Sequence, residues 1–174
     1  MTDTQLAAER AARIIERLHA GRIEVIASLP DSWLSAVIDC VEADHRFTHA
    51  RVTREDDAMA IAAGAALMGS RGAVLCQNAG VLLSTNVLAA YANHHQLPLV
   101  VIAAARGGAD DGFFYQAYKG QVTDAVAHAV GLTVHHIDSA EQDWLFERAA
   151  EQAWLQRRPV VLLCTRAALL GAAR

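Results

Sequence analysis

The strongest constraint on the fold is a regular alternation of short, mostly aliphatic runs with longer segments of helical pattern. Runs such as 23–29 (IEVIASL), 98–105 (PLVVIAAA) and 159–165 (PVVLLCT) lack strict apolar–polar alternation, which is typical of strands buried on both faces. The segments between them are long enough to form covering helices. This order predicts an α/β fold, a doubly wound parallel sheet with helices on both faces.

The expected elements cover most of the 174 residues and leave no linker, repeat or low-complexity segment between them. We therefore expect a single domain over 1–174, with a leading helix at 1–21 and a core at 22–165. Strands are expected at 23–29, 47–53, 73–77, 98–105, 133–137 and 159–165, and helices at 4–20, 31–43, 55–69, 81–95, 121–130 and 140–156. The last helix is expected to be amphipathic, with Trp144, Leu145, Ala149, Gln152 and Leu155 at roughly helical spacing.

Charge and composition exclude several kinds of partner. The net charge of −4 lacks the basic stripe of a nucleic-acid-binding protein. The apolar stretch 81–105 is interrupted too often by polar residues to span a membrane. The first residues show no cationic start followed by an apolar run, so we expect a cytoplasmic protein. Cys40, Cys76 and Cys164 stand apart among apolar residues and are expected to be buried, reduced thiols.

In a doubly wound sheet, ligands bind beyond the carboxyl ends of the strands, so the loops after the strands hold the candidate site. After the first strand, Asp31 and Ser32 either cap the next helix or face a ligand. After the second, Glu55, Asp56 and Asp57 occupy a first helical turn, where the helix dipole stabilises acids. The helix that follows is rich in alanine and contains Gly64, which permits close approach of another backbone or a flat ligand.

The third and fourth loops also leave alternatives open. Gln77, Asn78 and Gly80 suit either a capped turn or a flat heterocycle that forms hydrogen bonds. The loop 106–116 combines three glycines with an aromatic cluster and fits either a mobile lid or an interface. Two adjacent histidine pairs, 94–95 at a helix end and 135–136 in a strand, point in different directions and predict no metal site.

Together these motifs resemble the pyrimidine-binding domain of thiamine diphosphate-dependent enzymes. The nearest resemblance is to the separate pyrimidine-binding subunits of sulfopyruvate and phosphonopyruvate decarboxylases. The matching stretches are LPDSWL (29–34), REDDAMAIAAGAAL (54–67), AVLCQNAGVLLSTN (73–86) and PLVVI (98–102) followed by RG, within a resemblance that covers about residues 22–165.

The resemblance implies a role for each matched residue. In this family the glutamate that matches Glu55 binds N1′ of the aminopyrimidine and is catalytic, because it promotes loss of the C2 proton of the thiazolium. Gln77, Asn78 and Gly80 resemble the segment that lies along the pyrimidine. Asp31 resembles the residue on the substrate side, and we expect Ser32, Tyr115 and Gln116 to lie there too.

The resemblance also implies that the active site is incomplete. The family holds the diphosphate through Mg²⁺ bound by a GDG segment and a later Asn on a second domain, and no GDG occurs in this sequence. No metal site is therefore expected in this chain. A separate diphosphate-binding (beta) subunit would supply the Mg²⁺ half in a hetero-oligomer such as α₂β₂ or larger. The implied activity is the decarboxylation of a small 2-oxo acid.

One motif departs from the family. The related decarboxylases resemble EHxxMG where this chain has YQAYKG at 115–120, so that Gln116 replaces a histidine on the substrate side. With the aromatic cluster at 113–115, this change predicts a less charged, aromatic or branched 2-oxo acid. A carboligase or C–C lyase subunit and a non-catalytic α/β binding module are the alternatives.

Overall fold

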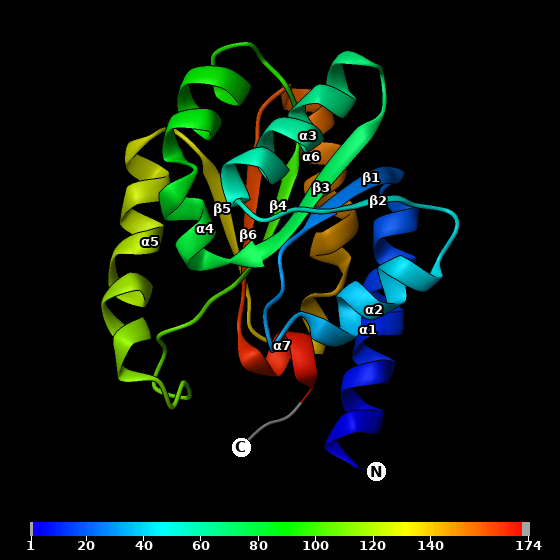
Figure 1. Ribbon diagram of the computed structural model, residues 1–174, viewed down its shortest axis with the longest axis vertical. Coiled ribbons are helices and arrows are strands. Elements are labelled where there is room, and N and C mark those ends of the chain that lie inside the picture. The colour runs from blue at the N-terminus through cyan, green and yellow to red at the C-terminus, as the bar shows by residue number, and fades with distance from the viewer. Residues whose placement is uncertain (1, 172–174) are drawn as a thin grey trace.

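Within residues 2–171, which a computed structural model describes, six strands form one parallel sheet in the order β2-β1-β3-β4-β6-β5 (Figure 1). Every neighbouring pair runs parallel. The strands are β1 Ile23–Ser28, β2 Thr48–Arg51, β3 Arg71–Gln77, β4 Val100–Ala104, β5 Thr133–Ile137 and β6 Val160–Cys164.

Helices connect the strands and cover both faces of the sheet. The α-helices are α1 Asp3–Ala20, α2 Ser35–Ala43, α3 Glu55–Leu67, α4 Asn78–Leu83, α5 Ala117–Ala129, α6 Trp144–Gln156 and α7 Arg166–Leu170. A π-helix, η1, spans Val87–Asn93, and the 3₁₀ turns η2 and η3 span Phe114–Gln116 and Ala140–Gln142.

The core is divided into two layers by the sheet. Helices α1, α2, α6 and α7 pack on one face, and α3, α4, η1 and α5 pack on the other (Figure 1). All five residues of β4 and of β6 are buried. The prediction of a doubly wound parallel sheet is therefore confirmed, and the strands without apolar–polar alternation are its central ones.

The strand order places a topological switch point between β1 and β3. The chain passes from β1 outward to β2, and then crosses back to β3 on the other side of β1. Such switch points open a crevice at the carboxyl ends of the strands, where α/β proteins bind ligands.

The alanine-rich helix α3 uses its small side chains against its own sheet. A Cβ at Gly72 of β3 would lie 2.8 Å from Cα of Ala62, so the helix and the strand are in backbone contact there. Gly64, in contrast, faces open space, because a Cβ added at this glycine would meet no atom within 4 Å. The close approach expected at Gly64 is therefore made elsewhere on the helix, at Ala62.

Several expected helices differ from the observed ones. Helix α2 begins at Ser35, because residues 31–34 form a turn instead of the first helical turn. The expected helix 81–95 is two elements, α4 and the π-helix η1. Helix α5 begins at Ala117, four residues before the expected start, and α7 was not expected.

The buried face of α6 agrees with the expected stripe at Ala149 and partly at Leu145, but not at its two ends. Trp144 and Leu155 are 51% and 79% exposed, whereas Phe146, Ala149, Ala150 and Ala153 are buried. The small side chains let α6 approach the end of α1 closely, since a Cβ at Gly21 would lie 2.8 Å from that of Ala150. The buried face of α6 therefore combines Phe146 with three alanines, and Ala150 makes the close contact with the end of α1.

Candidate functional site

Four loops that follow the neighbouring strands β2, β1, β3 and β4 meet at one edge of the sheet, because the strands are all parallel. Hydrogen bonds join three of these loops. The amide Nε2 of Gln77, at the end of β3, donates to Oδ2 of Asp31 at 3.0 Å. Nη1 of Arg106, after β4, donates to the same oxygen at 3.0 Å. The structure thus brings together two of the residues that the sequence selected, Asp31 and Gln77.

Asp31 uses both carboxylate oxygens within the chain. Oδ1 accepts the backbone N–H of Trp33 at 2.9 Å, which forms a turn over residues 31–34. Asp31 therefore stabilises a turn before α2 and does not cap the helix itself, and Leu34 is the residue at the N-cap position. Ser32 is exposed, and its Oγ accepts a bond from Arg106 at 3.3 Å.

Arg106 is the centre of this edge and was not selected from the sequence. Its side chain is only 4% exposed and pairs with Asp31 and with Asp111, the latter at 2.8 Å from Nε to Oδ2. The guanidinium also lies over the ring of Trp33, 4.3 Å from its centroid. Hydrogen bonds from Arg106 hold the pKa of the Asp111 carboxyl below its usual range. The signal that could have indicated Arg106 is a basic residue directly after a buried apolar strand.

The glycine-rich loop 106–116 is fastened to α5 at its start. Gly107 has a φ of +92°, and a Cβ at Gly120 of α5 would lie 2.8 Å from the carbonyl oxygen of Arg106. The backbone N–H of Gly107 also donates to Asp111 at 3.0 Å. Beyond this point the aromatic side chains turn outward, with Phe114 90% and Tyr115 57% exposed.

Glu55 is the first residue of α3, directly after β2, and its side chain is half-buried. Within the part of the chain that the structure describes, its carboxylate forms no hydrogen bond or ion pair. Its neighbour Asp56 is paired with Arg54, at 2.9 Å from Oδ2 to Nη2. Of the acids in this turn, Glu55 is the one that is half-buried and left with free acceptors.

Gly80 allows Glu55 to occupy this position. A Cβ at Gly80 would overlap Cγ of Glu55 and would lie 3.1 Å from Sγ of Cys76. The Glu55 side chain therefore lies against the backbone of α4. Burial, with a smaller effect of the nearby Glu55 and Asp31 carboxylates, raises the pKa of the Cys76 thiol, which stays protonated at the end of β3.

Two buried side chains at this edge hold acceptors without partners among the described residues. Oδ1 of Asn78 and Oε1 of Gln116 make no hydrogen bond there. The Nδ2 group of Asn78 donates to the carbonyl oxygen of Arg106 at 2.9 Å, so its amide holds the fourth loop against α4. Buried acceptors are seldom left unpaired in folded proteins. These two amide oxygens therefore keep unused acceptor capacity inside the edge.

The two histidines of β5 point in different directions, as the sequence predicted. His135 and His136 point to opposite faces of β5, toward Gln152 of α6 and Asp124 of α5. Among residues 2–171, no group of three or more His, Cys, Asp or Glu side chains could hold a metal ion. No helix of that part of the chain is long and apolar enough to cross a membrane.

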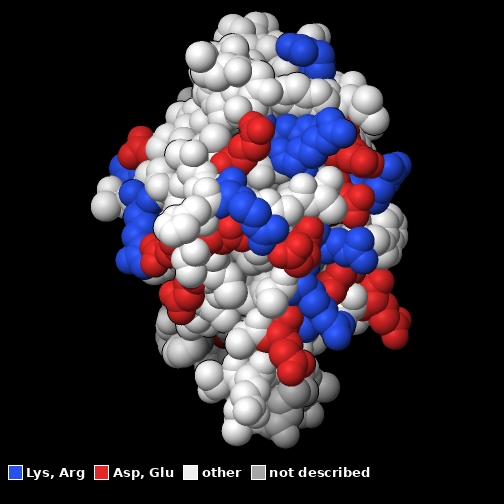
Figure 2. Space-filling model, turned by 90° about the vertical axis from the view of Figure 1, so that its right-hand side faces the viewer, with Lys and Arg blue, Asp and Glu red and all other residues white. Residues whose placement is uncertain are grey.

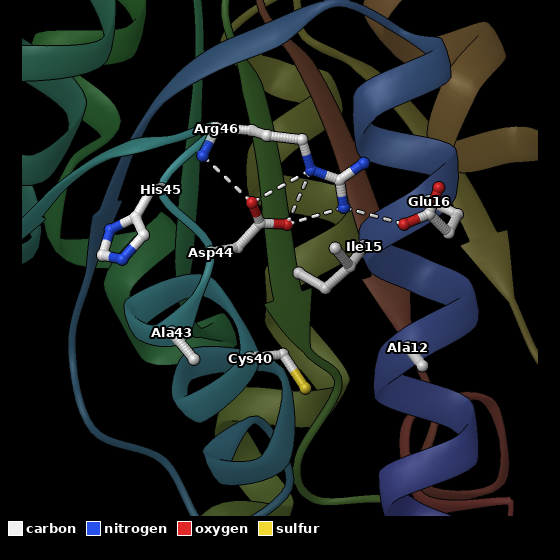
Figure 3. Close-up of a pocket in the computed structure, with 8 residues that line it drawn as sticks. All are labelled: Ala12, Ile15, Glu16, Cys40, Ala43, Asp44, His45 and Arg46. Atoms are coloured by element: carbon white, nitrogen blue, oxygen red, sulfur yellow. Dashed lines mark hydrogen bonds and ion pairs between the residues drawn. The ribbon is translucent and has the colours of Figure 1, made fainter.

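A further groove lies away from this edge. It has a volume of about 690 Å³ and is bounded by α1, the end of α2 and the segment after it (Figure 3). Asp44 and Glu16 both bind Arg46 there, at 2.7 and 2.8 Å. The surrounding face carries acidic and basic side chains in close alternation (Figure 2). Two of its carboxylates are thus paired with a basic side chain of the same groove.

The aminopyrimidine ring of thiamine diphosphate fits the groups at the sheet edge. N1′ of that ring requires a carboxyl group as its partner, and Glu55 offers one that is half-buried and unpaired. Gly80 contributes by leaving room for the Glu55 side chain, which lies against the backbone of α4. The free Oδ1 of Asn78 is an additional acceptor at the same edge.

The fold and this edge define a doubly wound α/β domain with polar side chains gathered at its switch point. A family described as "Thiamine pyrophosphate enzyme, N-terminal TPP binding domain" matches residues 9–130, more than half of the chain. The chain belongs to this family. The resemblance that the sequence motifs predicted is therefore confirmed.

The chain is similar in sequence to proteins named as decarboxylase subunits and to a protein named as a decarboxylase. The chain is 36% identical to sulfopyruvate decarboxylase subunit alpha of Methanothermobacter thermautotrophicus over 59% of its own length and 63% of that subunit. It is 27% identical to the subunit of the same name from Methanocaldococcus jannaschii, over 86% of this chain and 89% of that subunit. It is 30% identical to phosphonopyruvate decarboxylase of Streptomyces viridochromogenes, over 77% of this chain but only 32% of that protein.

A solved structure shares the fold. The 2-oxoglutarate:ferredoxin oxidoreductase of Magnetococcus marinus superposes with a TM-score of 0.73 over 92% of this chain and 29% of that one. At 15% sequence identity, this likeness concerns the fold alone.

Proposed function

We propose that this chain is the alpha subunit of a two-subunit, thiamine diphosphate-dependent decarboxylase of 2-oxo acids. The family match and the relatives named as decarboxylase alpha subunits support this function. The observation that carries it is the free, half-buried carboxylate of Glu55 at the start of α3, beside the bare backbone of Gly80.

Thiamine diphosphate, when bound, supplies the electron sink for the negative charge that remains when a 2-oxo acid loses carbon dioxide. Glu55 would share a proton with N1′ of the pyrimidine, and its partial burial would limit the access of water to this contact. Gln77 at the end of β3 and Asn78 at the start of α4 are the residues along which we place the pyrimidine. Asp31, Ser32, Tyr115 and Gln116 are the residues that we place on the substrate side.

A separate beta subunit would hold the diphosphate through Mg²⁺. The family's GDG segment does not occur in this sequence, and the described residues offer no metal-binding group. The name "subunit alpha" of the relatives supports such a partner. The complete active site would then lie between two chains of a hetero-oligomer.

The test is the substitution Glu55→Gln in the assembled enzyme, with Asp57→Asn as the matched control. Both remove one negative charge from the same helical turn, but Asp57 is exposed. We expect Glu55→Gln to lower kcat by at least about 100-fold, the usual contribution of a positioned acid–base group. Asp57→Asn should leave kcat within about threefold and both variants should unfold like the parent chain.

Full activity of Glu55→Gln would contradict the assigned proton position. Thiamine diphosphate binding without decarboxylation of any 2-oxo acid would favour a carboligase or C–C lyase subunit. Absence of thiamine diphosphate binding by the assembled complex would leave a non-catalytic binding module and refute the proposal.

A further inference from the structure

Lys119 is the one lysine of the sequence, in which lysine and arginine together number fifteen. It lies in the first turn of α5 and is half-buried, next to the edge that holds the proposed cofactor site. Its Nζ is 3.4 Å from Oε1 of Gln77, whose amide group also binds Asp31. Asp31, Gln77, Arg106 and Asp111 form a network of hydrogen bonds at the strand ends. Lys119 joins this strand-end network through Gln77.

The charge of this network is negative without Lys119. Asp31 and Asp111 both direct their carboxylates at one arginine, Arg106, so one negative charge remains. The unpaired carboxylate of Glu55 adds a second negative charge. The carboxylates of Glu55 and Asp31 both contribute to the raised pKa of the Cys76 thiol at the end of β3. An anionic substrate would be repelled from this edge unless a free cation lay there.

Arg106 cannot serve as that cation. Its Nε and Nη2 donate to Asp111 and its Nη1 donates to Asp31 and Ser32. Its side chain is 4% exposed, so a ligand has little access to it. The guanidinium is committed to holding the loops together.

Lys119 is different, because its ammonium group has spare donors. Among the described residues it makes one long hydrogen bond, to Gln77, and no ion pair. The ring centroid of Tyr115 lies 5.7 Å from Nζ, which gives the ammonium group an aromatic neighbour and no counter-ion. A half-buried ammonium with unused donors is a ready partner for a carboxylate or sulfonate.

We propose that Lys119 binds an acid group of the 2-oxo acid and thereby sets the affinity of this site for anionic substrates. The inference rests on the proposed function, whose own test is at Glu55. The expectation of a less charged substrate rests on the aromatic cluster and on Gln116. A cation at Lys119 instead favours a substrate that carries an acid group.

The first test is kinetic and uses the enzyme assembled with its beta subunit. Lys119→Met should raise KM for pyruvate or sulfopyruvate by about 10- to 100-fold, as expected for the loss of a charge-assisted hydrogen bond. We expect kcat and the Kd of thiamine diphosphate to change by less than about threefold. Lys119→Arg should restore part of the affinity. Arg13→Met, which removes the same charge from the exposed side of α1, is the control and should leave KM unchanged.

The second test needs no turnover. Because the chain has a single lysine, [ε-¹³C]lysine incorporated in this chain alone gives one side-chain NMR signal, in the parent protein and in the complex. Pyruvate or sulfopyruvate should shift this signal, and methyl pyruvate, which has no acid group, should not. A shift with sulfopyruvate alone would assign Lys119 to the distal acid group, and a shift with both would assign it to the carboxylate.

An unmoved signal with both acids, or an equal shift with methyl pyruvate, would overturn the proposal. An unchanged KM in Lys119→Met would do the same while decarboxylation continued. Loss of the proposed function would look different, since it would abolish activity on every 2-oxo acid in the parent enzyme.

Discussion

The substitution Gly80→Ala tests whether activity requires the observed position of Glu55. It should displace the Glu55 side chain while changing the stability of the fold only slightly. The new Cβ would overlap Cγ of Glu55 and lie 3.0 Å from Cβ of Glu55, closer than the usual contact distance of about 3.5–4.0 Å. The Glu55 side chain must therefore move by more than about 1 Å or rotate away. Displacements of about 1 Å in a catalytic group can lower activity by about 100-fold.

The effect on stability should be small, because two contributions oppose each other. Alanine is better than glycine within a helix by about 1 kcal/mol. Overlap with a side chain that can rotate, and with Sγ of Cys76 at 3.1 Å, costs about 1–3 kcal/mol. We expect a net loss of at most about 2 kcal/mol in the free energy of unfolding, measured by urea denaturation of the isolated chain.

The matched control is Gly64→Ala, at a helical glycine whose added Cβ would meet nothing within 4 Å. It should raise the free energy of unfolding by up to about 1 kcal/mol, which corresponds to about 2–4 °C in Tm. Decarboxylation by the enzyme assembled with the beta subunit is then compared for both variants. If Gly80→Ala kept full activity with an intact fold, Glu55 would not need its observed position and the proposed site would be refuted.

Two further predictions concern stability. Arg10 binds Asp143 through two hydrogen bonds of 2.6 Å and also donates to the carbonyl oxygen of Ala168, so Arg10→Met should lower the free energy of unfolding by about 3–5 kcal/mol; in urea denaturation, a loss below about 1 kcal/mol would show that the pair is dispensable. Burial lowers the pKa of His49, whose Nε2 lies 2.8 Å from Oγ of Ser28. The unfolded chain therefore binds this proton more readily, so the contribution of neutral His49 is present above about pH 6.5 and is lost as the pH falls through the lowered pKa. His49→Gln should flatten the fall in stability between about pH 7.5 and 5, and an unchanged slope would assign it to other groups.

The sequence predicted the sheet well, because burial on both faces leaves a direct trace in composition. The aliphatic runs of β4 and β6 are buried at every residue, and the loops after them lie at one edge simply because the strands are parallel. The pairing of Asp31 with Gln77 follows from the same topology.

What could not be predicted depends on contacts between distant segments. Arg106 and Asp111 are close in sequence, but the carboxylate of Asp31 that completes the pair is 75 residues away from Arg106. The buried face of α6 depends on how near α1 can approach, and so favours Ala150 over Trp144. A residue pattern shows which secondary structure a segment favours. These contacts depend instead on which distant segments pack against it.

The charged side chains at the sheet edge form two groups, one with ionic partners within the chain and one without them. Asp31 and Asp111 are satisfied within the chain by Arg106, so the three loops that they join can fold without any bound molecule. Burying such a set is tolerable only when each charge is paired, and here the side chains of all three are at most 4% exposed. Glu55 and Lys119 are half-buried at the same edge and lack ionic partners among the described residues. Their opposite charges are left for molecules that come from outside the chain, a ring nitrogen for the carboxyl group and an acid group for the ammonium.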